Sequence, residues 1–203
     1  ALPICFSRLF ELGLSFSNKD IIQKLDGVVD ELISRDYTQE DYLYLLSISR
    51  IVAGNIAKNK NDFIKAETQE KFVSIIEEMS DYYFQRGDYS LYRNCCPNYM
   101  DWLKILKRQD EIDAVLLKIG ESYVLDADKE GNSNLVKAEF YQLAAKHYAN
   151  IGEREKVYYL KVKIKNAFKD AGSSGEFKTI STTQSVSVEQ LEKETKDFFK
   201  EDR

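Results

Sequence analysis

The residues of this sequence that could bind a metal or act as a nucleophile are one histidine, His147, and three cysteines, Cys5, Cys95 and Cys96. A zinc site draws on several His and Cys ligands, and a Cys–His pair would need a cysteine brought to His147 from a distant helix. Cys95 and Cys96 are adjacent, so on a helix they point about 100° apart and do not chelate. We expect His147 to be a surface or half-buried helix residue and these two cysteines to be packed in a core.

Phosphate loops and acid–base pairs are not indicated either. Residues 172–175 read Gly-Ser-Ser-Gly but lack the preceding strand and the following Lys-Ser/Thr of a phosphate loop. Carboxylate pairs such as Glu77 with Glu78, or Asp126 with Asp128, lie in charge-rich stretches that single out neither pair as an acid and base. We therefore expect no catalytic residue, no metal site and no cofactor in this sequence.

The sharpest charge feature is a set of five lysines with no acid among them, Lys156, Lys161, Lys163, Lys165 and Lys169. Three of them recur every four residues and form a stripe on a helix. Such a face suits RNA or an acidic protein surface. The alternative is a solvated helix face whose cations interact favourably with the helix dipole. Because the net charge of the chain is −5, nucleic acid is the less favoured partner.

Aromatic side chains form a second candidate surface. Tyrosine is the commonest of them, with 13 residues. The residues that would line an aromatic partner groove are Tyr82, Tyr89, Tyr92, Tyr99 and Trp102. Tyr and Trp are favoured at interface hot spots. The alternative, which we favour, is that these side chains fill the core between helices.

The elements that would position these residues are helices. The 203 residues include only 9 Gly and 2 Pro, too few for the turns of a sandwich or barrel. Apolar residues recur every three or four positions. Helices are expected over residues 18–33, 38–56, 61–86, 88–107, 110–129, 134–150 and 153–170, with Pro97 kinking or splitting the fourth. The fold class is therefore all-α.

The chain is expected to have three parts. Residues 1–171 form a body of helical repeats, and residues 172–186 form a flexible linker or short strand. Residues 187–203 begin with a capping box and form an amphipathic helix. Its apolar side, Val188, Leu191, Phe198 and Phe199, either caps the body or docks on a following domain or a partner.

Short connections make consecutive helices antiparallel neighbours, and a series of such pairs predicts a right-handed solenoid of the tetratricopeptide kind. Residues 138–164 resemble a degenerate tetratricopeptide unit through Tyr141, Ala144, Ala145, Tyr148 and Gly152. In that family small residues let two helices approach closely. The sequence departs from the pattern at Val157, where Ala is usual, and at Lys161, where an aromatic is usual.

A broader stretch, about residues 80–200, resembles the N-terminal helical region of a bacterial family of unknown function. The matching segments are Gly87-Asp88-Tyr89, Gly120-Glu121-Ser122-Tyr123, Phe140-Tyr141-Gln142-Leu143-Ala144, Gly152-Glu153-Arg154-Glu155-Lys156-Val157 and Gly175-Glu176-Phe177-Lys178-Thr179-Ile180. That family's separate C-terminal domain carries an Arg-Asn-x-x-x-His-Gly motif, and similar motifs occur in ribonuclease toxins of defence systems. The resemblance implies that any chemistry lies downstream of Arg203, since Arg93-Asn94 is followed by no His within ten residues.

The favoured hypothesis is a non-catalytic helical scaffold, part of a larger bacterial protein, that binds a protein partner or a downstream domain of the same chain. The alternative is an RNA-contacting helical domain of a nuclease or phage-defence protein. The sequence has no apolar run of about 18 residues, so we expect no membrane span. An odd number of cysteines and no basic leader favour the cytoplasm.

Overall fold

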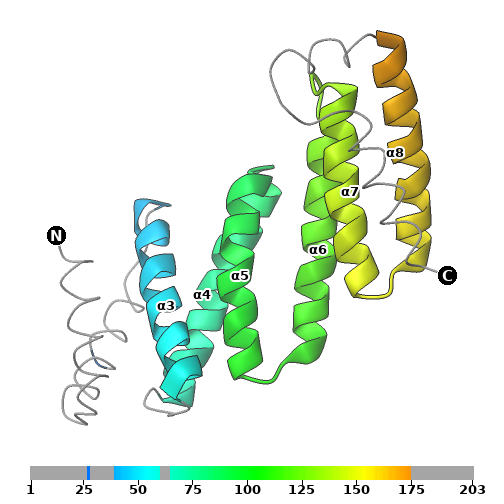
Figure 1. Cartoon of the computed structure of the whole chain (residues 1–203). Helices are drawn as coiled ribbons and strands as arrows, with labels where there is room; N and C mark the ends of the chain where they lie inside the picture. Colours follow the sequence, from blue (N-terminus) through cyan, green and yellow to red (C-terminus); the bar gives the residue numbers. More distant parts are fainter. Residues whose placement is uncertain (1–26, 28–38, 60–64, 175–203) are drawn as a thin grey trace. The chain divides into compact units, whose positions relative to one another are not determined.

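The computed structural model describes residue 27, residues 39–59 and residues 65–174 (Figure 1). These residues form six helices and no strand, which confirms the all-α prediction. The helices are α3 (Gln39–Asn59), α4 (Ala66–Gln85), α5 (Tyr89–Ile105), α6 (Gln109–Ala127), α7 (Asn134–Asn150) and α8 (Arg154–Ser174). The chain divides into two compact units, residues 1–115 and 116–203, and α6 crosses the boundary.

The bounds of the helices follow the sequence prediction closely where both can be compared. The α7 helix has the predicted bounds, and α4, α5 and α6 begin or end within a few residues of them. Residues 60–64, the expected start of the third helix, and the helix expected over 18–33, apart from residue 27, lie outside the described residues. Pro97 lies inside a continuous α5, so the chain does not split there. Buried residues on both sides of Pro97, including Cys96 and Tyr99, hold the two halves of the helix in one core.

Three helix ends share one hydrogen-bonding pattern, the Schellman motif. After α4, Gly87 N–H donates to the Phe84 carbonyl (3.1 Å) and Asp88 N–H to the Tyr83 carbonyl (3.0 Å). Both α5 and α7 end in the same way. The motif places one residue in the left-handed region, where glycine meets no steric penalty. Gly87 (φ 76°) and Gly152 (φ 77°) meet that requirement, whereas α5 uses Lys107 (φ 59°).

The first unit has a core built by α4 and α5, with α3 packed against α5. Trp102 is fully buried and stacks on Phe72, with the ring centroids 4.9 Å apart. Its indole Nε1 donates to Ser49 Oγ (2.6 Å), and Asn98 Nδ2 donates to the Leu46 carbonyl (3.1 Å). These two hydrogen bonds tie α5 to α3 and satisfy polar groups that would otherwise be buried without a partner.

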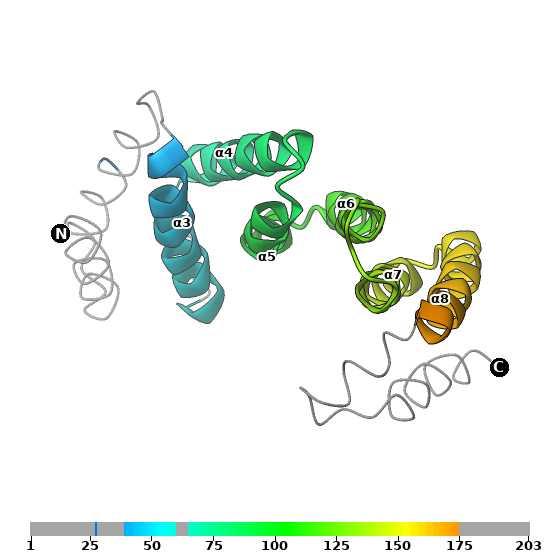
Figure 2. The ribbon, with the colours of Figure 1, turned by 90° about the horizontal axis from the view of Figure 1, so that it is seen from above.

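The second unit is centred on the α7–α8 hairpin, whose helices lie side by side and antiparallel (Figures 1 and 2). Its core combines small alanines with larger side chains from α6, α7 and α8: Ala127, Tyr141, Ala144, Ala145, Tyr148, Val157, Leu160 and Ile164. Ala144 and Ala145 are both fully buried, as the close helix approach expected from the sequence requires. Ser133 caps α7 by accepting a hydrogen bond from Val136 N–H (3.3 Å).

The C-terminal bound of α8 differs from the expectation for the linker. The helix runs to Ser174, so residues 172–174, assigned to the start of the linker by the sequence analysis, are helical. Ala171 is fully buried against the second unit, and this packing keeps the last turn helical past Gly172. The rest of the predicted linker, residues 175–186, lies outside the described residues.

Candidate functional site

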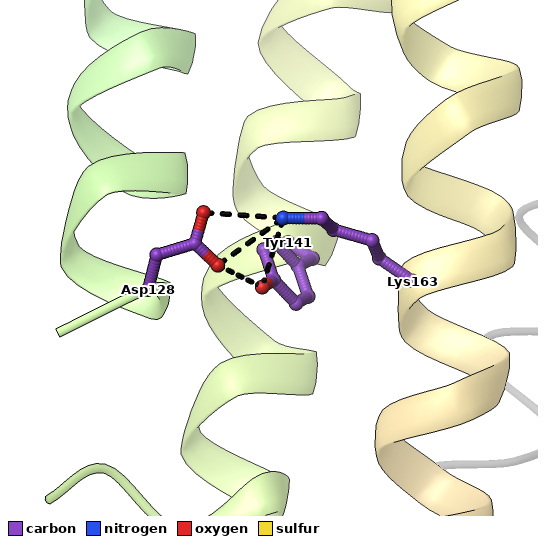
Figure 3. Close-up of polar contacts among 3 residues, drawn as sticks. All are labelled: Asp128, Tyr141 and Lys163. Carbon is purple, nitrogen blue, oxygen red and sulfur yellow. Dashed lines mark hydrogen bonds and ion pairs between the residues drawn. The ribbon is translucent and has the colours of Figure 1, made fainter. Parts of the chain in front are cut away.

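A polar cluster in the second unit joins one residue from each of three segments (Figure 3). Asp128 follows the last residue of α6, Tyr141 belongs to α7 and Lys163 to α8. Lys163 Nζ lies 3.2 and 3.1 Å from the two Asp128 carboxylate oxygens and 3.4 Å from Tyr141 Oη. The Tyr141 hydroxyl donates a short hydrogen bond to Asp128 Oδ1. We call these three residues the clasp.

Local structure explains how the clasp is positioned. Asp128 N–H donates to the Val124 carbonyl (3.0 Å), so the backbone of Asp128 continues the last turn of α6. The Tyr141 ring is buried in the core and carries its hydroxyl to the surface beside Asp128. The Lys163 ammonium lies 4.9 Å from the Tyr141 ring centroid and 5.3 Å from that of Tyr159, within the range of cation–π attraction.

The protonation states of the clasp oppose an acid–base role. Burial, and then the hydrogen bond to Asp128, raises the pKa of Tyr141 above its usual 10.0, against a smaller lowering by Lys163. Burial lowers the pKa of Lys163, but hydrogen bonds to Asp128 and Tyr141 outweigh it, so the net pKa lies above 10.5. A general acid or base works best with a pKa near the operating pH. Both groups move away from neutrality, so the clasp has the chemistry of a structural ion pair.

The outer surface of α8 carries the most exposed large apolar side chains among the described residues. Tyr158 is 72% exposed, Tyr159 57% and Val162 47%, whereas the next most exposed large hydrophobic side chains, Leu91 and Leu125 on other helices, are 38% and 36% exposed. They lie on the side of α8 away from Val157, Leu160 and Ile164, which fill the core. We call these three exposed residues, together with Lys161, Lys165 and Lys169, the α8 outer face.

The five predicted lysines are divided between two sides of α8. Lys163 belongs to the clasp, and Lys156 pairs with Glu153 (3.4 Å) with its ammonium 5.3 Å from the Tyr148 ring centroid. Lys165 and Lys169 are exposed and Lys161 is half-buried. The structure therefore places Lys161, Lys165 and Lys169 on the α8 outer face, whereas Lys163 contacts Asp128 after α6 and Lys156 contacts Glu153 in the α7–α8 turn.

The predicted aromatic groove is not a surface feature. Trp102, Tyr92 and Tyr99 are 0%, 2% and 7% exposed, so they cannot contact a partner, and the packing alternative is the one the structure bears out for them. Burial, and then the nearby Glu77 carboxylate, raises the pKa of Tyr99. Tyr82 and Tyr89 are half-buried, and Tyr89 packs edge-on against Phe84 (5.4 Å). The groove fails because α5 turns its aromatic side toward α3 and α4.

The remaining candidate residues are packed as the sequence analysis expected. Cys95 and Cys96 are buried and form no disulfide, and burial raises the pKa of the Cys95 thiol to about 11. Cys96 Sγ donates to the Tyr92 carbonyl (3.2 Å). His147 is half-buried and stacks on Tyr123, with the ring centroids 5.7 Å apart. The predicted docking residues Val188, Leu191, Phe198 and Phe199 lie outside the described residues.

The exposed apolar residues of the α8 outer face were not predicted from the sequence. Only the lysines of this helix were singled out, although Tyr158, Tyr159 and Val162 lie between them in the sequence. The available signal was the helical period: Val157, Leu160, Ile164, Ala167 and Ala171 define a complete buried side, so Tyr158 and Val162 fall opposite it.

Comparison of the chain with protein-family models, with curated proteins and with solved structures gave no match. Among the described residues, no three or more His, Cys, Asp or Glu side chains gather in a way that would hold a metal ion. None of the described helices has the length and apolar character needed to cross a membrane.

Proposed function

We propose that this chain is a non-catalytic helical scaffold that binds another protein or a neighbouring domain through the α8 outer face. The observation that carries the proposal is the exposure of Tyr158, Tyr159 and Val162 on one side of a single helix. Single exposed apolar side chains are common on protein surfaces, but several that gather on one side of a helix are typical of an interaction site. Tyrosine is also enriched among the residues that dominate binding energy at protein interfaces.

The solenoid arrangement belongs to the same proposal. The α7–α8 hairpin has the buried alanines and the turn glycine that the tetratricopeptide resemblance leads one to expect, and α4 and α5 form a second hairpin with a similar turn. A series of such hairpins would present helix faces in a row to a partner. On this view α8 offers one such face.

One observation favours the nucleic-acid alternative. Exposed tyrosines beside lysines are the combination on which single-stranded bases stack. Three observations oppose it: Lys156 and Lys163 have acidic neighbours, Val162 adds an apolar centre, and the net charge of the chain is −5. A protein partner with acidic residues around an apolar centre fits the α8 outer face better.

The test places a photo-reactive benzoylphenylalanine at position 158 of the full chain, expressed in the cells that make the protein. Position 125 in α6, where Leu125 is 36% exposed, is the matched control. We expect crosslinks to a defined protein or domain at position 158 only, insensitive to ribonuclease and lost when Lys161, Lys165 and Lys169 are changed to Glu. Crosslinks removed by ribonuclease would establish the nucleic-acid alternative, and equal yields at both positions would end the proposal.

A further inference from the structure

The exposed surface of α8 contains a regular line of residues that suits packing against another helix. All five are exposed, and they follow one another at alternating spacings of three and four residues: Glu155, Tyr158, Val162, Lys165 and Lys169. This alternation keeps side chains on one side of a helix, and it is the spacing by which two helices pack along their length. We call these residues the α8 line. Its middle, Tyr158 and Val162, is apolar, and its two ends are charged.

A second copy of the chain presents the same line, and the charges decide which orientation of the two copies is favourable. In a parallel pair each residue meets its own counterpart, so Glu155 opposes Glu155 and Lys165 opposes Lys165, and like charges disfavour the contact. In an antiparallel pair with the two-fold axis at the level of Leu160, residues equally far before and after Leu160 meet. Glu155 of each copy then lies opposite Lys165 of the other, so opposite charges meet.

The same register brings the apolar residues together. Tyr158 and Val162 are equally far from Leu160, so each Tyr158 packs against the Val162 of the other copy. Tyr158 is 72% exposed and Val162 47% exposed in the single chain, so this contact removes from water apolar surface that the fold of one chain leaves uncovered. The charged pairs lie outside the two apolar layers, as a polar rim surrounds the centre of an interface. Tyr159 lies beside its own counterpart on one flank.

The remaining charged residues on this side of α8 lie outside these layers. Lys169 and Asp170 extend past the first residue of α8 in the second copy, so they face no charge of that helix. Like charges come near each other on one flank only, Lys161 with its own counterpart and Arg154 with Lys165. Both contacts lie at the rim, where water and salt screen the repulsion, whereas the opposite charges meet on the α8 line itself. Lys161 and Lys169 have interactions within their own chain, so neither is needed as an ion-pair partner across the axis.

We propose that two copies of the chain pair antiparallel along their α8 lines, with Glu155 of each copy beside Lys165 of the other and Tyr158 against Val162. The inference rests on the proposed function, because it names a second copy of the chain as the partner of the α8 outer face. One pair of helices buries less area than the roughly 2,000 Å² or more of a permanent dimer. We therefore expect a reversible dimer with a dissociation constant of about 1–100 µM.

Sedimentation equilibrium of the full chain measures this dissociation constant. Because the two-fold axis repeats every contact, E155K or K165E alone sets like charges against each other twice and should weaken the dimer at least about tenfold. The exchange E155K/K165E restores opposite charges at both places and should return the constant to within about threefold of the original. A parallel pair would not follow this pattern, because each residue would still meet its own counterpart. Y158S/V162S, which removes the apolar layers, should leave the chain monomeric.

The matched controls make the same charge changes on α7. Glu139 and Lys146 are exposed on that helix, so E139K, K146E and E139K/K146E should leave the dissociation constant unchanged. Circular dichroism of every variant reports whether the helices stay folded. An unmodified chain that is monomeric even at about 1 mM, or a folded E155K/K165E variant that dimerises no more tightly than E155K alone, would overturn the pairing.

The pairing and the proposed function fail in different ways. If the chain is monomeric but position 158 crosslinks to a different protein in the cell, the pairing is wrong and the partner-binding function stands. If the chain pairs as expected in solution, yet position 158 crosslinks to no protein in the cell, a second copy included, the partner-binding function is wrong and the pairing stands.

Discussion

At the scale of single residues, the end of α5 contains a strained backbone conformation at Lys107. The Schellman motif after α5 places Lys107 at φ 59°, although the corresponding residues after α4 and α7 are glycines. A side chain with a Cβ pays a steric penalty in the left-handed region. The hydrogen bonds of the motif, Lys107 N–H to the Lys104 carbonyl (3.1 Å) and Arg108 N–H to the Leu103 carbonyl (2.9 Å), hold it there. Arg108 is also tied to Glu70 at 2.5 Å.

We predict that Lys107→Gly stabilises the protein. Removing the Cβ should relieve more strain than the added freedom of the unfolded chain costs, with a net gain of about 0.5–1 kcal/mol. Urea unfolding followed by circular dichroism measures the change. Gly87→Ala, at a position with φ 76°, is the reverse control and should destabilise by a similar amount. A midpoint for Lys107→Gly below that of the unmodified chain would contradict the prediction.

At the scale of helices, close approach depends on residues without bulk. A Cβ built on Gly120 of α6 would lie 2.5 Å from a ring carbon of Tyr148 on α7. The Tyr148 ring is 6% exposed and sits among Ala144, Val157 and Leu160, so it has little room to move. Burial, and then the charges of Glu121 and Glu153, raises the pKa of Tyr148 to about 12. The absence of a side chain at Gly120 therefore lets α6 pack closely against the Tyr148 ring of α7.

Gly120→Ala should destabilise the second unit by about 1–3 kcal/mol, because overpacking outweighs the better helix propensity of alanine. Gly54→Ala in α3 is the matched control: nothing lies within 4 Å of its added Cβ, so the propensity gain of up to about 1 kcal/mol should appear alone. Thermal unfolding of the two variants should move in opposite directions. Stabilisation by both changes would show that Tyr148 is not held in place.

At the scale of the whole molecule, buried tyrosines and the buried Cys95 thiol determine how stability responds to alkaline pH. Burial is the first cause of a raised pKa at Tyr83, Tyr99, Tyr141 and Tyr148. These four residues are distributed over both compact units. The unfolded chain, with tyrosine pKa values near 10, releases protons before the folded chain does. The tyrosine contribution to stability is therefore complete below about pH 10 and is lost as the pH rises through the folded values. Burial also raises the pKa of the Cys95 thiol from 9.0 to about 11, so its contribution begins to be lost at a lower pH than that of the tyrosines.

The free energy of unfolding should accordingly be flat from about pH 7 to about pH 8, fall gradually near about pH 9 as the Cys95 thiol of the unfolded chain ionises, and fall more steeply above about pH 10. In Tyr141→Phe the alkaline fall should be shallower, since one raised group and the proton it retains are gone. Lys163 contributes with the same sign, because its pKa also lies above the unfolded value of 10.5. Urea midpoints measured across this range, with tyrosine ionisation followed by absorbance, provide the check. A rise in stability above pH 10 would contradict the assignment.

The helices themselves follow from the sequence, because the apolar period and the turn glycines are local signals. The bounds of α7, the positions of Gly87 and Gly152, and the burial of Ala144 and Cys95 were predictable in this way. Those signals fix which residues share one side of a helix.

Only the tertiary structure decided which side meets another helix and which stays exposed. The sequence predicts Lys163 to be one of several surface lysines, yet in the structure it forms an ion pair with Asp128 at the end of α6. From the sequence, Tyr99 and Trp102 could line a binding groove or fill the core. Their packing against α3 and α4 places both in the core. Tyr158 stands exposed because α7 already fills the opposite side of α8. Contacts between residues distant in the chain determine burial, and the helical period does not contain them.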